Sequence, residues 1–213
     1  MNIKTLLIVG AGGFGREVHA WLVDWIEQNE GWRIGGFIND GPGSVARFGH
    51  YPDVVSSVDD YRPQPDEYLV CAIGKPSDRR LVVEKLLARG AEFFTLIHPT
   101  AVIGENVSIG RGSVICPTCV LSADIEIGAF VNINIGCVVG HDATLGDFCT
   151  LSAHCVITGA CVLEEEVFMG THASLIPKVR AGKQSVIGSA SVAVRNVAAG
   201  TTVFGVPAKR ISG

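Results

Sequence analysis

Residues 103–144 read IGENVS IGRGSV ICPTCV LSADIE IGAFVN INIGCV VGHDAT, seven consecutive blocks of six residues with one pattern. The pattern continues to Phe204, and the first position of all seventeen blocks is apolar. The fifth position carries no charged or aromatic residue, and the second is glycine in nine blocks, as expected where a chain turns through conformations closed to residues with a Cβ. A period of six does not fit a helix. It is typical of a parallel β-helix, in which stacked coils bury apolar faces that one repeat cannot bury alone.

Blocks of this form, followed by GVPAKRI at residues 205–211, resemble the hexapeptide-repeat acyltransferases, whose β-helix is left-handed. The resemblance implies triangular coils of three blocks each, so residues 103–204 would form between five and six coils. At a strand spacing of about 4.8 Å the prism would be roughly 27 Å tall. General chirality rules favour right-handed crossovers, so the left hand follows from the resemblance alone.

The first hundred residues have a different pattern. A buried strand is predicted over residues 5–9, then the turn GAGGFG at residues 10–15 and a helix over about 16–28. Further strands are expected over 32–38, 68–73 and 94–97, and a second helix over 77–89. We therefore expect an α/β domain with a short Rossmann-like parallel sheet at residues 1–97, followed by the β-helix and a C-terminal tail at residues 98–213.

The glycine-rich turn follows a strand and opens a helix. In this context backbone N–H groups and the helix N-terminus can approach a phosphate, which favours a nucleotide or nucleotide-sugar site. A domain of this length supplies only about half of a dinucleotide fold, so a nicotinamide cofactor is not favoured. The alternative is a tight turn whose glycines serve packing alone.

An α/β domain joined to such a β-helix through Ile97-His98-Pro99 resembles one subfamily of sugar acyltransferases. It includes the N-acetyltransferases of nucleotide-linked amino sugars and the sialic acid O-acetyltransferases, and the resemblance covers almost the whole chain. It implies that the glycine turn and the residues after the second strand bind the sugar nucleotide. The implied substrate-binding residues are Gly10, Gly12, Gly13, Asn39 and Asp40, with Gly74 and Lys75 at the next strand end.

Acyl transfer requires a base and a hydrogen-bond donor for the oxyanion. His141 stands outside the inward positions of its block and is followed by Asp142, a pair that resembles the catalytic motif of the family. Asp142 would orient the imidazole and favour its protonated form. Gly159 lies eighteen residues after His141, one coil along in the same column and about 5 Å away, so its backbone N–H is the predicted oxyanion donor.

The C-terminal end is basic, which suits the phosphates of coenzyme A. Residues 167–213 hold six basic and no acidic residues, whereas the preceding part has a net charge of −10. A solvated tail is the alternative. Many family members have a second histidine nine residues after the first, where this chain has Thr150, so that contact is either lost or made differently. The residues predicted to contact the acyl donor are Thr150, His154, His172, Lys178, Arg180, Lys183, Arg195 and Lys209.

The predicted function is acetyl-CoA-dependent N-acetylation of a nucleotide-linked amino sugar, a precursor of a surface glycan or lipopolysaccharide. The resemblance further implies a homotrimer with coenzyme A between neighbouring prisms. Sugar O-acetylation is the nearest alternative, followed by a non-catalytic β-helix scaffold and a γ-carbonic-anhydrase-like metalloenzyme, suggested by His154 and His172 one coil apart.

Composition narrows the other function classes. Five of the seven cysteines occupy the small inward position of their blocks, which indicates packing, and no second Cys-x-x-Cys pair supports zinc, so no metal site is expected. A net charge of −4 disfavours nucleic acid. There is no apolar run of eighteen residues and no signal-peptide cleavage region, so we expect a cytoplasmic protein without membrane insertion.

Overall fold

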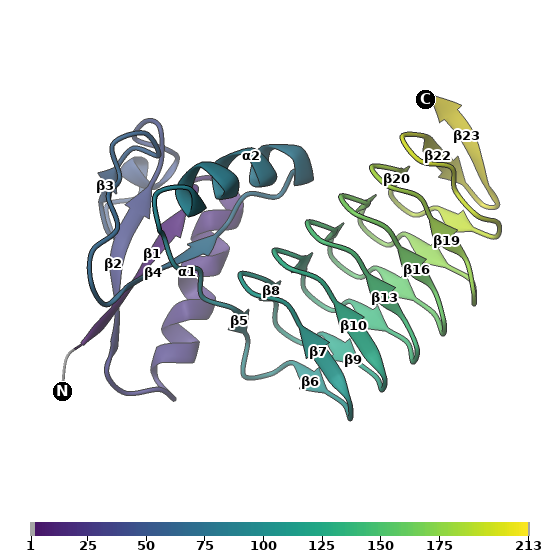
Figure 1. The fold of residues 1–213 in the computed structure, drawn as a ribbon, viewed down its shortest axis with the longest axis horizontal. Coiled ribbons are helices and arrows are strands. Elements are labelled where there is room, and N and C mark those ends of the chain that lie inside the picture. Colours follow the sequence, from purple (N-terminus) through teal and green to yellow (C-terminus); the bar gives the residue numbers. More distant parts are fainter. Residues whose placement is uncertain (1–2, 213) are drawn as a thin grey trace.

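The computed structural model describes residues 3–212, which form an α/β domain packed against one end of a triangular β-helix (Figure 1). The α/β domain has a parallel sheet with strand order β3-β2-β1-β4. Its helices lie on opposite sides of this sheet, because α1 packs with one set of alternate strand residues and α2 with the other. The elements are β1 (Lys4–Val9), α1 (Gly13–Ile26), β2 (Trp32–Ile38), the 3-10 turn η1 (Val45–Arg47), β3 (Val54–Ser56), β4 (Glu67–Cys71) and α2 (Pro76–Leu87).

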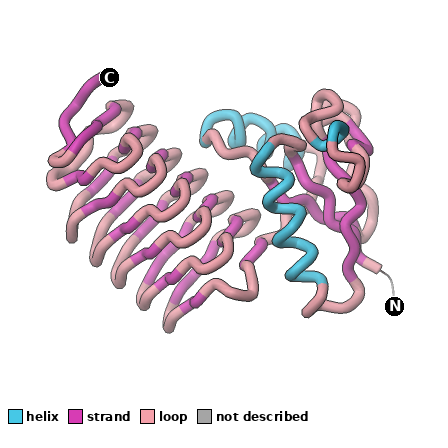
Figure 2. The backbone as a smooth tube through the Cα atoms, turned by 180° about the vertical axis from the view of Figure 1, so that it is seen from behind, coloured by secondary structure: helices cyan, strands magenta, loops and turns pink. Residues whose placement is uncertain are grey.

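The β-helix has three faces, visible as stacked coils in Figure 2. The docked face, which carries the α/β domain, consists of β5 (Leu96–Ile97), β8 (Val114–Ile115), β11 (Asn132–Ile133), β14 (Thr150–Leu151), β17 (Phe168–Met169), β20 (Val186–Ile187), β22 (Thr202–Gly205) and β23 (Ala208–Ser212). The valine face consists of β6 (Val102–Ile103), β9 (Val120–Leu121), β12 (Val138–Val139), β15 (Val156–Ile157), β18 (Ser174–Leu175) and β21 (Val192–Ala193). The polar face consists of β7 (Val107–Ile109), β10 (Ile125–Ile127), β13 (Thr144–Leu145), β16 (Val162–Leu163) and β19 (Arg180–Ala181).

The coils turn through left-handed backbone conformation at the fourth position of the blocks. Nearly every such residue is not glycine: Asp142, His154 and Glu166 have φ of 59°, 59° and 58°. The glycines at the second position serve another purpose. Gly140 has no positive φ, but a Cβ there would stand 2.8 Å from the backbone nitrogen of Gly159 in the next coil. The explanation of these glycines by backbone conformation was therefore wrong for Gly140, where the close approach of adjacent coils excludes a side chain.

The cysteines are free and buried in the interior. The thiol of Cys149 is within hydrogen-bonding distance of a carbonyl fifteen residues further along, with 3.0 Å between Sγ and the Glu164 oxygen. Cys119, Cys137, Cys155 and Cys161 make the equivalent contact, each with the carbonyl fifteen residues further along, at Sγ to oxygen distances of 3.1–3.2 Å. These thiols therefore fill the small inward position and also contact a corner carbonyl.

A buried arginine joins the two parts of the molecule. Arg79 of α2 is 0% exposed, and its guanidinium donates to the carbonyls of Ile73 and Gly74 and, across the junction, to the carbonyls of Phe148 and Cys149. It also donates to the hydroxyl of Thr150 at 2.9 Å. Burial lowers the pKa of Arg79 to about 10, and five oxygen acceptors keep it protonated at neutral pH. The loop after β4 is thus tied directly to the docked face.

The strand predicted over 94–97 belongs to a different sheet from the one expected. Phe93 makes a single bridge to Leu69 of β4, whereas Leu96–Ile97 pairs with Val114–Ile115 as the first rung of the docked face. The division into domains at residues 97 and 98 remains a prediction. Neither helix of residues 3–212 is long and apolar enough to cross a membrane.

Candidate active site

His141 and Asp142 lie on the corner between the valine face and the polar face, just after β12. The imidazole Nδ1 is 2.6 Å from Asp142 Oδ2, and both side chains are well exposed, at 67% and 61%. A carboxylate can only accept, so Nδ1 carries the proton of this hydrogen bond. The other ring nitrogen, Nε2, is then free to take a proton from a nucleophile.

Gly159 lies beneath this imidazole, one coil further along. Val138 and Val139 pair in register with Val156 and Ile157, which fixes the offset of eighteen residues. A Cβ on Gly159 would stand 2.6 Å from Nε2 of His141, so the ring is in contact with the glycine backbone. In residues 3–212 the N–H of Gly159 has no hydrogen-bond partner, and it can donate to a developing oxyanion.

Further along this corner, in the coils toward the C-terminus, lie two cations and two apolar side chains. Lys178 and Arg195 stand two and three coils above the His141–Asp142 pair and make no ion pair within the described chain. Ile176 and Val194, both 39% exposed, lie beside them. By contrast, Arg180 and Lys183 on the polar face are paired with Glu164 and Glu165 at 2.5 and 3.0 Å. Lys209 lies on β23 at the C-terminal end.

Three predicted contacts of the acyl donor lie elsewhere. His154 and His172 are on the corner between the docked face and the valine face, exposed and stacked with ring centroids 5.0 Å apart and planes at 10°. Thr150 lies on the docked face and is 6% exposed, and its hydroxyl donates to the carbonyl of Gly74 at 2.8 Å. Their role toward an acyl donor remains a prediction.

The glycine turn separates into packed and open positions. A Cβ on Gly10 would stand 3.0 Å from the Ala72 oxygen, and one on Gly15 would stand 2.0 Å from the Gly10 oxygen, so both serve packing. Gly12, the N-cap of α1, has no atom within 4 Å of its missing Cβ, and Gly13 has only the Arg16 guanidinium, at 3.9 Å. The first turn of α1 is therefore open to a ligand.

Asn39 and Asp40 follow β2, and the Asn39 side chain contacts the glycine turn. Asn39 accepts from the N–H of Ala11 at 3.1 Å and donates to the Gly41 carbonyl at 3.0 Å. One oxygen of Asp40 accepts from the N–H of Val58 at 2.8 Å. A cavity of about 350 Å³ lies next to them, lined by Asn39, Gly41, Pro42, Val54, Val55, Ser56 and Ser57. Of the predicted nucleotide contacts, Asn39 thus borders a cavity, although the side chains of Asn39 and Asp40 are already hydrogen bonded.

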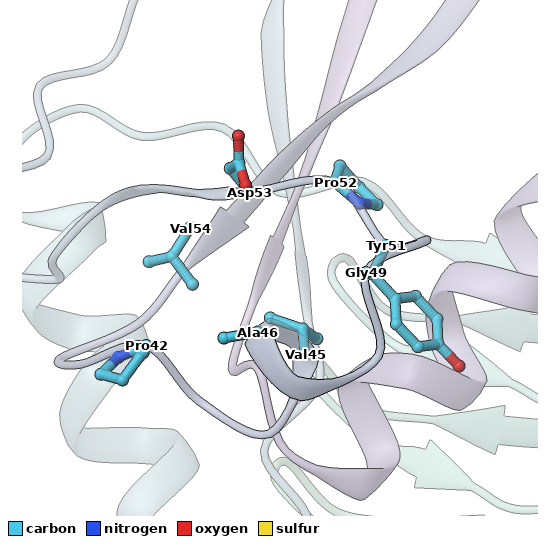
Figure 3. Close-up of a pocket in the computed structure, with 8 residues that line it drawn as sticks. All are labelled: Pro42, Val45, Ala46, Gly49, Tyr51, Pro52, Asp53 and Val54. Carbon is cyan, nitrogen blue, oxygen red and sulfur yellow. The ribbon is translucent and has the colours of Figure 1, made fainter.

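The loop at the end of β4 is also open. Gly74 has no atom within 4 Å of its missing Cβ, and Lys75 is paired with Asp78 at 2.9 Å. A further cavity of about 480 Å³ is lined by residues of segment 42–54 and shares Pro42 and Val54 with the cavity beside Asn39 (Figure 3). None of the predicted catalytic residues lines the Figure 3 cavity.

Sequence reasoning missed a smaller cavity between α1, Gly74 and the docked face. It has a volume of about 160 Å³, and Glu17 and Asn132 line it. The outward column of the docked face holds Val114, Phe168 and Val186, and two of its coils carry polar residues, Asn132 and Thr150. That departure from the column was the available signal.

The α/β domain and His141 lie at different edges of the prism. The domain covers the docked face, whereas His141 lies beyond the valine face on its opposite corner. Within one chain, the glycine turn and the catalytic pair are therefore separated by the full width of the valine face. No group of three or more His, Cys, Asp or Glu side chains in residues 3–212 could hold a metal ion.

Comparisons with known proteins match both parts of the chain. Residues 5–86 match the PglD N-terminal domain family. The perosamine N-acetyltransferase PerB from Caulobacter crescentus, solved in complex with CoA and GDP-perosamine, has a TM-score of 0.88 and 28% identity, covering 99% of this chain and 98% of that one. The chain is therefore similar to sugar N-acetyltransferases with a hexapeptide-repeat β-helix.

Two further relatives agree with this assignment. The acetyltransferase domain of PglB from Neisseria gonorrhoeae, solved with acetyl coenzyme A, has a TM-score of 0.87 and 28% identity, covering 99% of this chain and 100% of that one. The UDP-N-acetylbacillosamine N-acetyltransferase of Bacillus subtilis is 32% identical over 117 residues. This alignment covers 53% of this chain and about half, 51%, of the Bacillus enzyme.

Agreement with solved structures over nearly the full chain confirms the expected fold class, an α/β domain followed by a left-handed β-helix. Variants of the Caulobacter enzyme with a histidine replaced by asparagine or alanine have also been solved with CoA and GDP-perosamine. The roles of individual residues in the present chain remain predictions.

Proposed function

We propose that the protein transfers the acetyl group of acetyl-CoA to the amino group of a nucleotide-linked sugar. The observation that carries this proposal is the His141–Asp142 pair, whose imidazole lies against the backbone of Gly159. The chain matches sugar N-acetyltransferases over nearly its full length. Relatives that act on UDP-linked and GDP-linked amino sugars support the substrate class.

The proposed chemistry uses His141, Asp142 and the backbone N–H of Gly159. The neutral amine attacks the thioester carbonyl carbon, and its proton passes to Nε2 of His141 while Asp142 accepts from Nδ1–H. The Gly159 N–H stabilises the oxyanion. Collapse of the intermediate breaks the C–S bond, and coenzyme A leaves as the thiol after taking up a proton. The new C–N bond is an amide.

Acetyl-CoA fits the upward continuation of this corner. Lys178 and Arg195 are unpaired cations that suit phosphate, and the exposed side chains of Ile176 and Val194 offer an apolar surface for the pantetheine arm. Arg180 and Lys183 are less suited because carboxylates already neutralise them. Of the basic residues expected to bind the phosphates of coenzyme A, those on the His141 corner are therefore the best suited.

A homotrimer is part of the proposal, because one chain holds the two halves of the site apart. The valine face carries an exposed ladder of Val102, Val120, Val138 and Val156, with 38–58% of each residue accessible. The outward column of the polar face, from Ser108 through Glu126 and Thr144 to Arg180, is mainly polar. Exposed apolar ladders mark interaction surfaces, and identical copies associate with closed symmetry.

With three valine faces turned toward one axis, adjacent copies meet corner to corner. The His141 corner of one copy then adjoins the corner between the docked and valine faces of the next, where His154 and His172 lie. The α/β domain of that second copy would bring its glycine turn toward His141. We propose a cytoplasmic location as well.

The test is acetyl transfer by the purified protein to a panel of sugar nucleotides. The panel holds GDP-perosamine, UDP-linked amino sugars, and the same nucleotides with a hydroxyl in place of the amino group. We expect an acetylated product with the amino sugars alone, detected by mass spectrometry and by release of free thiol. An ester, cleaved by mild alkali, would instead establish O-acetylation. No product from any acceptor in the presence of bound acetyl-CoA would overturn the proposal.

A further inference from the structure

The cavity of about 160 Å³ beside Gly74 has a distinctive set of polar groups. Phe14 and Glu17 of α1 form one wall, and Asn132, Asn134 and Phe168 of the β-helix form the other. Pockets that bury a drug-sized ligand are usually about 300–1,000 Å³. This one can therefore take a single substituent-bearing ring, not a whole nucleotide.

Asn132 brings a buried acceptor without a partner to this cavity. The residue is 2% exposed, and its Nδ2 donates to the carbonyl of Ile73 at 3.1 Å. That carbonyl can only accept, which identifies the nitrogen end of the amide. Oδ1 is consequently a buried oxygen for which residues 3–212 provide no donor. Buried acceptors in native proteins are nearly always paired, so a donor from outside the chain is the natural complement.

Glu17 brings a second acceptor, and it is charged. Its carboxylate is exposed, and no hydrogen bond or ion pair joins it to any residue in the described part of the chain. The neighbouring Arg16 is directed to the ring of Phe48, with 4.5 Å from the guanidinium carbon to the ring centroid. Asn134 Oδ1 is already used, because it accepts from the N–H of Ile135 at 2.7 Å. Asn134 Nδ2 and the Ser152 hydroxyl also line the cavity and can donate to sugar oxygens. The two acceptors left for an ammonium group are the Glu17 carboxylate and Asn132 Oδ1, beside an apolar wall.

We propose that Glu17 and Asn132 recognise the amino-bearing end of the acceptor sugar and select an amine over a hydroxyl. An ammonium group offers a positive charge and three donors, whereas a hydroxyl offers one donor and no charge. The Phe14 and Phe168 rings would cover the apolar edge of the sugar. This inference rests on the proposed function, in which the adjoining corner of a neighbouring copy supplies His141.

The test compares binding of two ligands without acetyl-CoA, so that no turnover occurs. GDP-perosamine and the matching GDP-sugar with a hydroxyl at the amino position are titrated calorimetrically against the wild type and Glu17→Gln, and UDP-linked pairs are tested in the same way. Loss of the charge should weaken binding of the amino sugar about tenfold, the scale of one charge-assisted hydrogen bond, and leave the hydroxyl sugar unchanged. The control is Glu27→Gln at the exposed C-cap of the same helix, which should change neither affinity.

A second variant addresses the buried acceptor. Asn132→Thr keeps a donor for the Ile73 carbonyl, as Thr150 donates to Gly74 in the next coil, but removes the amide oxygen. We expect a smaller loss, about threefold to tenfold, again for the amine alone. Circular dichroism melting checks that the variant is folded.

The outcomes separate this inference from the function on which it rests. If the wild type acetylates an amino sugar but Glu17→Gln and Asn132→Thr weaken amine and hydroxyl ligands equally, or neither, the recognition proposal is wrong and the function stands. If the wild type neither binds nor acetylates any amino-sugar nucleotide, the function fails and the recognition proposal with it. A selective loss of amine affinity in both variants supports the inference.

Discussion

The imidazole of His141 rests against the backbone of Gly159, so closely that a Cβ on Gly159 would stand 2.6 Å from Nε2. This contact joins the predicted base to the predicted oxyanion donor without any intervening side chain. It also explains why the position after Thr158 has to be glycine: any side chain there would displace the ring.

Gly159→Ala should therefore impair catalysis without unfolding the protein. The methyl group would push the exposed imidazole away from the N–H that it adjoins, so kcat should fall by about tenfold to a thousandfold, the scale of losing a general base or an oxyanion donor. Steady-state kinetics and a melting curve check both parts. Gly182→Ala, 23 residues further along, is a poor control because its Cβ would meet Ala199 at 2.6 Å. Gly74→Ala, where the space is open, is the better one for stability.

His141→Asn should reduce kcat by about 10² to 10⁴, the usual contribution of general base catalysis. Asp142→Asn should do less damage, because the amide can still contact Nδ1 but no longer holds the proton there. Both side chains are well exposed, so the melting temperatures should stay near that of the wild type. Turnover of His141→Asn at the wild-type rate with saturating substrates would remove this residue from the mechanism.

Arg195 and Arg180 give a matched pair of variants that tests where coenzyme A binds. Arg195 stands unpaired on the His141 corner, whereas Arg180 is held by Glu164 at 2.5 Å. Arg195→Ala should weaken acetyl-CoA binding by about 1–3 kcal/mol, and the loss should shrink at high salt. Arg180→Ala should leave the affinity unchanged. Calorimetric titration at two salt concentrations measures both, and a reversed order would place the phosphates on the polar face.

The buried thiols predict how stability depends on pH. Burial raises the pKa of the Cys149 thiol to about 12, against 9.0 for an unperturbed thiol. Between about pH 9 and pH 12 the unfolded chain loses a proton that the folded chain keeps, so stability falls with rising pH, by about 1.4 kcal/mol per unit for one fully titrating thiol.

Cys149→Ser keeps a donor for the Glu164 carbonyl but does not ionise in this range. Urea unfolding at pH 8 and pH 10 should show a shallower decline for this variant than for the wild type. Cys149→Ala, which loses the donor and leaves a small cavity, should cost roughly 1–2 kcal/mol at pH 8. Identical slopes for wild type and Cys149→Ser would mean that the thiol is not protected in the folded state.

Much of the fold follows from the sequence because the six-residue repeat of the β-helix is strict and the α/β domain has clear strand and helix signals. The repeat from Ile103 fixed the coils and their register, and the expected helices and strands of the α/β domain differ from the observed ones by a few residues at their ends. The strand over 94–97 was assigned to the wrong sheet because an apolar run does not say which partner it pairs with. The left hand came from the family resemblance, not from local chirality.

The site divides in the same way. His141 and Gly159 could be found together because one coil is eighteen residues, and the same offset would have paired Glu165 with Lys183. Arg79 gave no signal, because a cation on a predicted helix is normally solvated and its five acceptors lie up to 71 residues away. The unpaired oxygen of Asn132 depends on how the α/β domain docks, which no local pattern encodes.

The most direct test of the account is complementation between two impaired variants, because the site is proposed to combine His141 of one copy with the glycine turn of another. One variant is His141→Asn, which lacks the base. The other is Gly12→Val, which should weaken the sugar-nucleotide site sterically, since Gly12 faces open space and its backbone suits other residues. Each variant alone should be nearly inactive at low sugar-nucleotide concentration. After the two are unfolded together in equal amounts and refolded, random trimers should regain about a quarter of the wild-type activity, because about one site in four pairs two intact halves. Activity no higher than the average of the separate variants, from mixed trimers verified by native mass spectrometry, would contradict a site shared between copies.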